Sequence, residues 1–182
     1  MSKILVDTID TRSGTTTLTL GSTNAGTIAL GSGDVQSNFL YPAFSVRLSS
    51  NQTLSNNTLT KITLDTEDYD TNSAFASNKF TVPSGLGGKY KITLNIYWSF
   101  GNTESASEIQ LHLYKNGSSV QREWISFNPT GRLSGAAQTL TMDMSLSASD
   151  YLEMYALGYT GGASIAAVDT QTRMHGYRLI GV

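Results

Sequence analysis

The sequence predicts an all-β protein, a sandwich of about ten short strands. No segment keeps the 3.6-residue period of an amphipathic helix, whereas apolar residues recur at every second position in many short runs. Turn-forming Gly, Asn, Ser and Asp separate these runs at intervals of about eight to twelve residues. Frequent turns between alternating strands are typical of two packed sheets.

Composition excludes several classes of function. The 182-residue chain has no cysteine, so it forms neither disulfides nor thiolate metal sites. Charged residues make up 14% of the chain, the formal net charge is -2, and there is no basic run, so we expect no nucleic-acid partner. No stretch approaches the roughly 18 apolar residues of a membrane span, so we expect no membrane insertion. Aspartates interrupt the N-terminus where a signal peptide has its apolar run.

Residues 1–38 differ from the rest of the chain. The segment TLTLGS from Thr17 recurs as TIALGS from Thr27. Each copy is a short alternating strand followed by a turn, and it is too small to bury its own apolar side chains. We therefore expect an N-terminal β-structured arm or stalk in which copies of the chain share an axis. A disordered leader is the alternative for such Gly/Ser/Thr-rich sequence.

Residues 39–182 form the expected head domain. Asn116-Gly117 between two alternating runs is a strong signal for a two-residue hairpin. Polar loops are expected at 101–107 and 129–135. The expected strands lie in FLYPAFSVRL, LTKITLDTEDYD, residues 78–82, GKYKITLNIYWS, residues 109–114, SVQREWISF, residues 140–146, YLEMYALGY, ASIAAVDT and RMHGYRLIGV.

The clearest of these strands is GKYKITLNIYWS, residues 88–99. Large apolar side chains fall on one of its faces and polar ones on the other, which predicts a strand half buried against the core. The predicted core face consists of Tyr90, Ile92, Leu94, Ile96 and Trp98. We expect the strands that follow to pair with this strand or to face it.

Five stretches of the head carry a family resemblance. They are Tyr69-Asp70, Asn78-Lys79-Phe80 with Gly88, Tyr90 and ITLNIYW, Leu113 to Gly117, Ala148 to Leu152, and His175 to Leu179. In this order they resemble the globular head of complement component 1, subcomponent q, which shares its jelly roll with tumour necrosis factor. The resemblance covers roughly residues 42–182 and implies a ten-stranded jelly roll that assembles as a homotrimer. No collagen repeat precedes the head, so no ligand is carried over from the family.

The opening segment MSKILVDTIDTRSGTTTLTLGS is similar to the N-termini of fibre and appendage proteins of marine bacteriophages. In those proteins a short leader precedes varied heads. The similarity implies that residues 1–38 dock on other virion proteins, and that the protein is located in the virion.

A catalytic site is not expected. His112 and His175 are the two histidines of the chain, and no nucleophile, base and orienting group can be named together. His112 lies opposite the apolar set of its strand, so we expect it to face solvent or a neighbouring subunit. We therefore predict no catalytic residues and no enzyme activity.

One acidic run has the character of a metal site, because hard cations take several carboxylate oxygens from a loop. The run consists of Asp65, Glu67, Asp68 and Asp70. It lacks the glycine spacing of a dedicated calcium loop. A solvated loop between strands that discourages edge pairing is the alternative, so calcium is the one cofactor considered and no other is expected.

Aromatic side chains are the candidates for ligand binding. Trp124 and Tyr159 are the chosen binding residues, because exposed aromatic rings can stack on sugars. Neither face of SVQREWISF is cleanly apolar, which also suits a subunit contact. Trp98 belongs to an apolar face, so we expect it in the core or at a trimer axis.

These observations favour a non-enzymatic, trimeric bacteriophage virion structural protein, a tail fibre or head fibre. Its head is expected to bind a glycan or protein of the host cell surface. One alternative is a capsid decoration or cement protein, in which the same trimer stabilises the particle. The other alternative is a secreted carbohydrate-binding module.

Overall fold

The computed structural model describes residues 42–103, 106–128, 133–160, 165–167 and 170–181. Every regular element in this part of the chain is a strand, which confirms the all-β prediction. No helix in the described ranges is long and apolar enough to cross a membrane. The predicted arm, residues 1–38, lies outside the described residues, as does the predicted boundary at Phe39.

The described residues form thirteen strands, three more than the sequence suggests. The additional strands are β2, β3 and β5, which have only two or three residues each and show no period of their own. The strands are β1 (Ala43–Arg47), β2 (Gln52–Leu54), β3 (Thr60–Lys61), β4 (Thr66–Asp70), β5 (Phe75–Ala76), β6 (Lys79–Thr81), β7 (Gly88–Thr103), β8 (Glu108–Lys115), β9 (Ser118–Ser126), β10 (Leu133–Leu146), β11 (Tyr151–Tyr159), β12 (Ile165–Ala167) and β13 (Arg173–Gly181).

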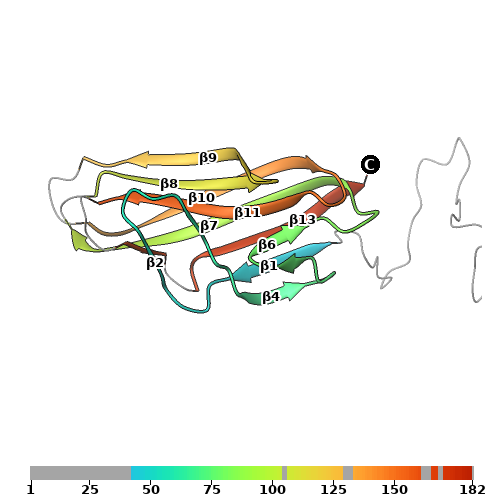
Figure 1. Cartoon of the computed structure of the whole chain (residues 1–182), viewed down its shortest axis with the longest axis horizontal. Helices are drawn as coiled ribbons and strands as arrows, with labels where there is room; N and C mark the ends of the chain where they lie inside the picture. Colours follow the sequence, from blue (N-terminus) through green and yellow to red (C-terminus); the bar gives the residue numbers. More distant parts are fainter. Residues whose placement is uncertain (1–41, 104–105, 129–132, 161–164, 168–169, 182) are drawn as a thin grey trace, which may run out of the picture. The chain divides into compact units, whose positions relative to one another are not determined.

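The strands pack as two antiparallel sheets, whose strands overlap in the view of Figure 1. Sheet A runs β4, β1, β13, β7 and β10, and the short β12 and β2 continue from the β13 side of β7. Sheet B runs β5, β6, β11, β8 and β9, and β3 also pairs with β11. The chain passes repeatedly from one sheet to the other, so strands close in sequence, such as β7 and β8, lie in opposite layers.

Strand β7 is the centre of sheet A, as its sequence predicts. Strand β10 pairs along one of its edges, while β13 and β12 pair along the other. The five predicted core side chains, from Tyr90 to Trp98, are each at most 1% exposed. They pack against the inward side chains of sheet B, which include Ile109, Leu111 and Leu113 of β8. Trp98 is therefore a core residue.

Two of the predicted loops are shorter than expected. Strand β7 continues to Thr103 and β10 begins at Leu133, so each strand takes up residues assigned to a loop from their Gly, Ser and Thr content. Cross-strand hydrogen bonding extends the ladder here despite weak strand propensity: Gly135 pairs with Ser99 of β7. A side chain at Gly135 would have its Cβ only 2.6 Å from the carbonyl oxygen of Trp98, so glycine permits this close pairing.

A polar bridge joins the two sheets at the edge formed by β9 and β10. The side chain of Gln138 on β10 accepts a hydrogen bond from the indole nitrogen of Trp98 on β7, at 3.3 Å. Its amide nitrogen donates to the backbone carbonyl of Glu123 on β9, at 2.9 Å. Gln138 is 3% exposed, so both ends of its amide are satisfied inside the protein. This bridge fixes β9 in sheet B relative to β10 in sheet A.

Candidate binding face

The outward face of sheet B carries exposed aromatic side chains. Trp124 is 55% exposed and Tyr159 is 41% exposed. Cross-strand register places Trp124 beside Gln110, and Gln110 beside Leu157, so both aromatic residues lie on the same side of the sheet. We call this surface the aromatic face. Its members are Glu108, Gln110, His112, Tyr114, Arg122, Trp124, Tyr155, Leu157 and Tyr159.

An irregularity in the β8–β9 hairpin decides which way Trp124 points. Asn116 and Gly117 both have positive φ, 51° and 79°, as the predicted two-residue turn requires. Directly after the turn, Tyr114 pairs with Ser119 but Leu113 pairs with Gln121, so Val120 is an extra residue in β9. Without this bulge the register would place Trp124 opposite Ile109 on the core face. The bulge shifts the register by one residue and turns Trp124 outward.

A chain of hydrogen bonds orders the polar part of the aromatic face. The amide nitrogen of Gln110 donates to the Glu108 carboxylate at 2.9 Å. The amide oxygen of Gln110 therefore faces the other way, and it lies 3.0 Å from His112 Nε2 and 3.5 Å from Arg122 Nη1. The guanidinium of Arg122 in turn lies over the Trp124 ring, 5.7 Å from its centroid. Arg122 is thus held between the amide and the indole.

His112 is a neutral structural member of this network. Because Gln110 offers an oxygen to Nε2, that ring nitrogen carries the hydrogen and donates. Nδ1 then accepts from the hydroxyl of Ser119, at 3.2 Å. Burial lowers the pKa of His112 below its usual value, and the nearby Arg122 charge lowers it further. His112 was expected to face solvent or a neighbouring subunit; it lies on the outward face, but its neighbours leave it only 8% exposed.

Beyond His112, on the side away from Trp124, the aromatic face continues with two packed tyrosine rings and an ion pair. The Tyr114 and Tyr155 rings lie 4.3 Å apart between centroids. Burial raises the pKa of Tyr155, with smaller contributions from Glu153, Tyr114 and Tyr151. The carboxylate of Glu153, which is 8% exposed, accepts a hydrogen bond of 2.6 Å from Lys61. Its charge is therefore compensated within the protein.

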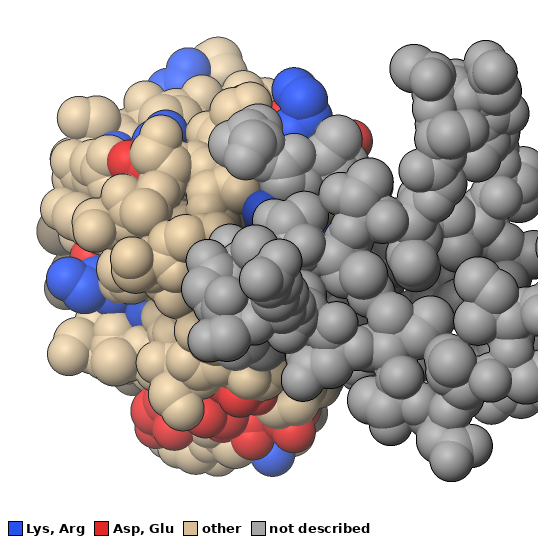
Figure 2. All heavy atoms as spheres, turned by 90° about the vertical axis from the view of Figure 1, so that its right-hand side faces the viewer, with Lys and Arg blue, Asp and Glu red and all other residues tan. Residues whose placement is uncertain are grey.

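The acidic run lies mainly in a strand. The alternative expectation of a solvated loop is wrong for Thr66–Asp70, which forms β4 at the edge of sheet A. A register shift between Ser45 and Val46 of β1 accommodates this pairing. Acidic side chains gather along the lower edge of the head in Figure 2, and β4 lies along the lower edge in Figure 1. Charged side chains on an edge strand discourage pairing with another chain.

Three carboxylates of the run bind groups of the protein itself. Asp65 accepts hydrogen bonds from the backbone nitrogen and hydroxyl of Ser49, both at 2.7 Å. Asp68 accepts from Arg47, and Asp70 accepts from the backbone nitrogen of Phe75. Within the described ranges, no three His, Cys, Asp or Glu side chains are placed to hold a metal ion together. Calcium binding by these residues stays a prediction.

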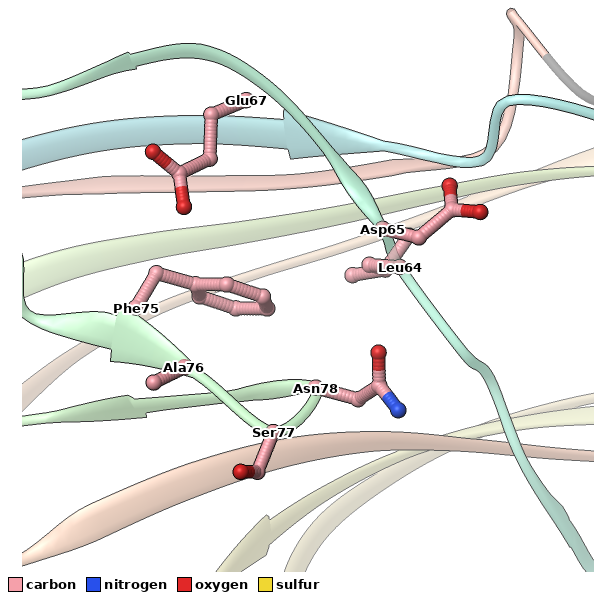
Figure 3. A pocket seen from close by; sticks show the side chains of 7 residues that line it. All are labelled: Leu64, Asp65, Glu67, Phe75, Ala76, Ser77 and Asn78. Atoms are coloured by element: carbon pink, nitrogen blue, oxygen red, sulfur yellow. The ribbon is translucent and has the colours of Figure 1, made fainter.

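A pocket of about 140 Å³ lies beside β4 (Figure 3). The Phe75 ring occupies the space between the two segments that form it, while the Asp65 carboxylate points away from this ring. Two members of the acidic run, Asp65 and Glu67, line this pocket. The Glu67 carboxylate points toward the side where Phe75 lies, whereas the Asp65 carboxylate points away from it. Its lining residues are Leu64, Asp65, Glu67, Phe75, Ala76, Ser77 and Asn78.

The two histidines do not form a joint site. His112 lies on the outward face of sheet B, and His175 lies in β13 of sheet A, paired with Ser45 and Thr93. Burial lowers the pKa of His175, and Arg173 lowers it further. Both imidazoles are thus held toward the neutral form for structural reasons.

No family model matches the chain, and no curated protein matches it. Solved structures do match. The structure of Eiger TNF from S. frugiperda gives a TM-score of 0.57 at 13% identity, over 79% of this chain and 95% of that chain. The globular domain of the zebrafish complement 1qA protein gives 0.51 at 16% identity, over 78% and 99%. The head is a jelly roll of this type.

The jelly-roll fold confirms the resemblance suggested by the five sequence stretches. It does not by itself identify a ligand, because sequence identities this low carry the fold alone. Sequence reasoning named Trp124 and Tyr159 and missed the supporting roles of Gln110, His112 and Arg122. Gln110 and His112 alternate with Ile109, Leu111 and Leu113, which places both polar side chains on one face of β8. Their proximity to Arg122 of β9 could not be predicted, because the bulge at Val120 changes which residues of β9 lie beside them.

Proposed function

We propose that this protein is a non-enzymatic, homotrimeric bacteriophage virion protein, a tail or head fibre, whose jelly-roll head binds the host cell surface. The aromatic face is the observation that carries the binding role. An indole that is 55% exposed would gain from burial in a complex, and a hydrogen-bonded network already orders the groups around it. In this proposal residues 1–38 dock the protein on other virion proteins; this part rests on the similarity of the opening segment to phage fibre proteins.

The outward face of sheet A supports the trimer. Strand β10 is 14 residues long and pairs only with β7 among the described residues, so it presents a long open edge. Its outward side chains Ala137, Thr139 and Thr141 are exposed, small and uncharged, and Asp143 is the one charged side chain in this outward row. A long edge without Lys or Pro is a hazard for an isolated chain, whereas a neighbouring copy that covers it removes the hazard.

Oligomeric state and cell binding test the proposal together. Sedimentation of the full-length protein at low micromolar concentration should give the mass of about three chains. Fluorescently labelled full-length protein should bind candidate host cells, and unlabelled protein should compete with it. A stable monomer contradicts the trimer. Protein that binds virus particles and stabilises them, but binds no cells, indicates the capsid decoration function instead.

A further inference from the structure

The chemistry of the aromatic face specifies the kind of molecule it binds. Trp124 and Leu157 flank Gln110, and Tyr159 lies beyond Leu157 on the same strand. Two strand spacings and two residues along β11 separate the backbone positions of Trp124 and Tyr159 by about 12 Å. Aromatic side chains on positions this far apart, with hydrogen-bonding side chains between them, suit an extended ligand that has both apolar faces and many hydroxyl groups.

A positive charge without an ion-pair partner among the described residues lies beside Trp124: Arg122 is on β9, the edge strand of sheet B. None of the ion pairs among the described residues includes Arg122, whereas Lys61, Lys91 and Lys115 all pair with carboxylates. Its neighbours within the described ranges include the amide oxygen of Gln110, at 3.5 Å, and the Trp124 ring. Both contacts orient the guanidinium without neutralising it, so its remaining N–H donors are available for an anion.

The network beneath Arg122 reduces the entropic cost of binding. Gln110 is itself fixed by Glu108 and His112, and His112 is fixed by Ser119. A guanidinium held in this way loses less conformational freedom when a ligand binds. A contact between two copies of the chain would instead favour a continuous apolar surface, and here polar side chains separate the aromatic ones.

We propose that the aromatic face binds an anionic saccharide of more than one sugar ring, which stacks on Trp124 and Tyr159 and pairs a carboxylate or sulfate group with Arg122. This inference rests on the proposed host-surface binding and specifies its ligand. Gln110 and Glu108 then lie between the two stacked rings, where they hydrogen-bond sugar hydroxyl groups.

The test measures binding of the full-length protein to dextran sulfate, to polygalacturonate and to unmodified dextran. We expect binding to at least one of the two anionic polymers and much weaker binding to dextran. The two anionic polymers distinguish a sulfate from a carboxylate as the recognised group. Equal binding to dextran and to both anionic polymers, or binding to none of them, overturns the proposal.

Three variants distinguish a specific site from general attraction to a polyanion. Arg122→Gln and Trp124→Ala should each weaken binding to the preferred polymer by about tenfold or more. Lys79→Gln is the matched control, because the Lys79 ammonium also lies over an aromatic ring, that of Tyr151, at 4.6 Å. It removes the same charge from the same sheet and should leave binding unchanged. Equal losses in Arg122→Gln and Lys79→Gln overturn the proposal.

Two parallel measurements separate this inference from the function on which it rests. Sedimentation of Trp124→Ala should still give a trimer; dissociation would show that the face is a contact between copies. Host-cell binding is measured with the same proteins. If the wild-type protein and both face variants bind cells equally, the host-binding function stands and the saccharide inference is wrong. If no protein binds cells but dextran sulfate or polygalacturonate binding depends on Arg122, the saccharide site stands and the host-binding function is wrong.

Discussion

The side-chain amide of Gln138 connects the indole of Trp98 in sheet A to the backbone carbonyl of Glu123 in sheet B. Replacing Gln138 with Leu keeps a similar volume but leaves the buried Trp98 indole nitrogen and the partly buried Glu123 carbonyl without this hydrogen-bond partner. Each unpaired group costs roughly 1–3 kcal/mol, so we expect the free energy of unfolding to fall by about 2–4 kcal/mol.

Urea denaturation measures this change. Ser145→Ala on the exposed face of β10 is the matched control, since it should alter stability by less than about 0.5 kcal/mol. If Gln138→Leu proves as stable as the wild-type protein, the bridge contributes nothing to joining the sheets.

Acid should destabilise the head partly through Asp150. The Lys115 ammonium beside it, together with Asn116 and the backbone of Ser147, lowers the pKa of Asp150 to about 2. Because this folded-state pKa is below the usual 3.8, the stabilisation is complete above about pH 5 and is lost as the pH falls toward 2. It amounts to at most about 2 kcal/mol after allowance for solvent screening.

Stability curves from pH 7 to pH 2 for wild type and Asp150→Asn measure this contribution. The two curves should converge at low pH, because the wild-type advantage disappears once Asp150 is protonated. Asp143→Asn, whose side chain is 62% exposed, should run parallel to the wild type throughout. Parallel curves for Asp150→Asn would mean that Asp150 does not contribute to the acid sensitivity.

The charge of Arg122 should be detectable in the titration of His112. Burial and Arg122 both lower the pKa of His112, so Arg122→Gln should raise it toward 6.5. Proton NMR of the imidazole measures this shift. His175 is an internal reference, because its pKa is lowered by burial and by Arg173 on the other sheet and should not change. An unchanged His112 titration contradicts the placement of Arg122 beside it.

The two tryptophans should differ in fluorescence. Trp124 is 55% exposed and Trp98 is fully buried, so Trp98→Phe should leave an emission at long wavelength that acrylamide quenches readily. Trp124→Phe should leave an emission at shorter wavelength that resists quenching. If the Trp124 emission resists quenching in the trimer, a neighbouring subunit covers the aromatic face.

The central core strand of the head could be predicted from the sequence, because the two-residue alternation of its apolar side chains is enough to show which of them are buried. The alternation from Tyr90 to Trp98 needs no knowledge of the partner strands, and all five side chains are buried as expected. The turn at Asn116 and Gly117 is equally local, since both residues tolerate positive φ.

The binding face could not be predicted in the same way. If β8 and β9 paired regularly outward from the Asn116-Gly117 turn, Trp124 would lie opposite Ile109 and would face the core. The extra residue Val120 reverses this assignment, and no local signal marks it, because a bulge depends on how two strands fit together. The acidic run was considered only as a metal site or a solvated loop, but it forms β4, because pairing with β1 outweighs its low strand propensity.

Because side chains alternate along a strand, the residues needed for folding and the residues available for binding are different ones in this head. In β8 and β9 the residues that maintain the packing point one way, and those available for recognition point the other. Selection or engineering could therefore replace Gln110, Arg122 and Trp124 without changing the side chains that hold the sheets together. Such a head could be directed to new targets by altering a few outward positions while the architecture stays constant.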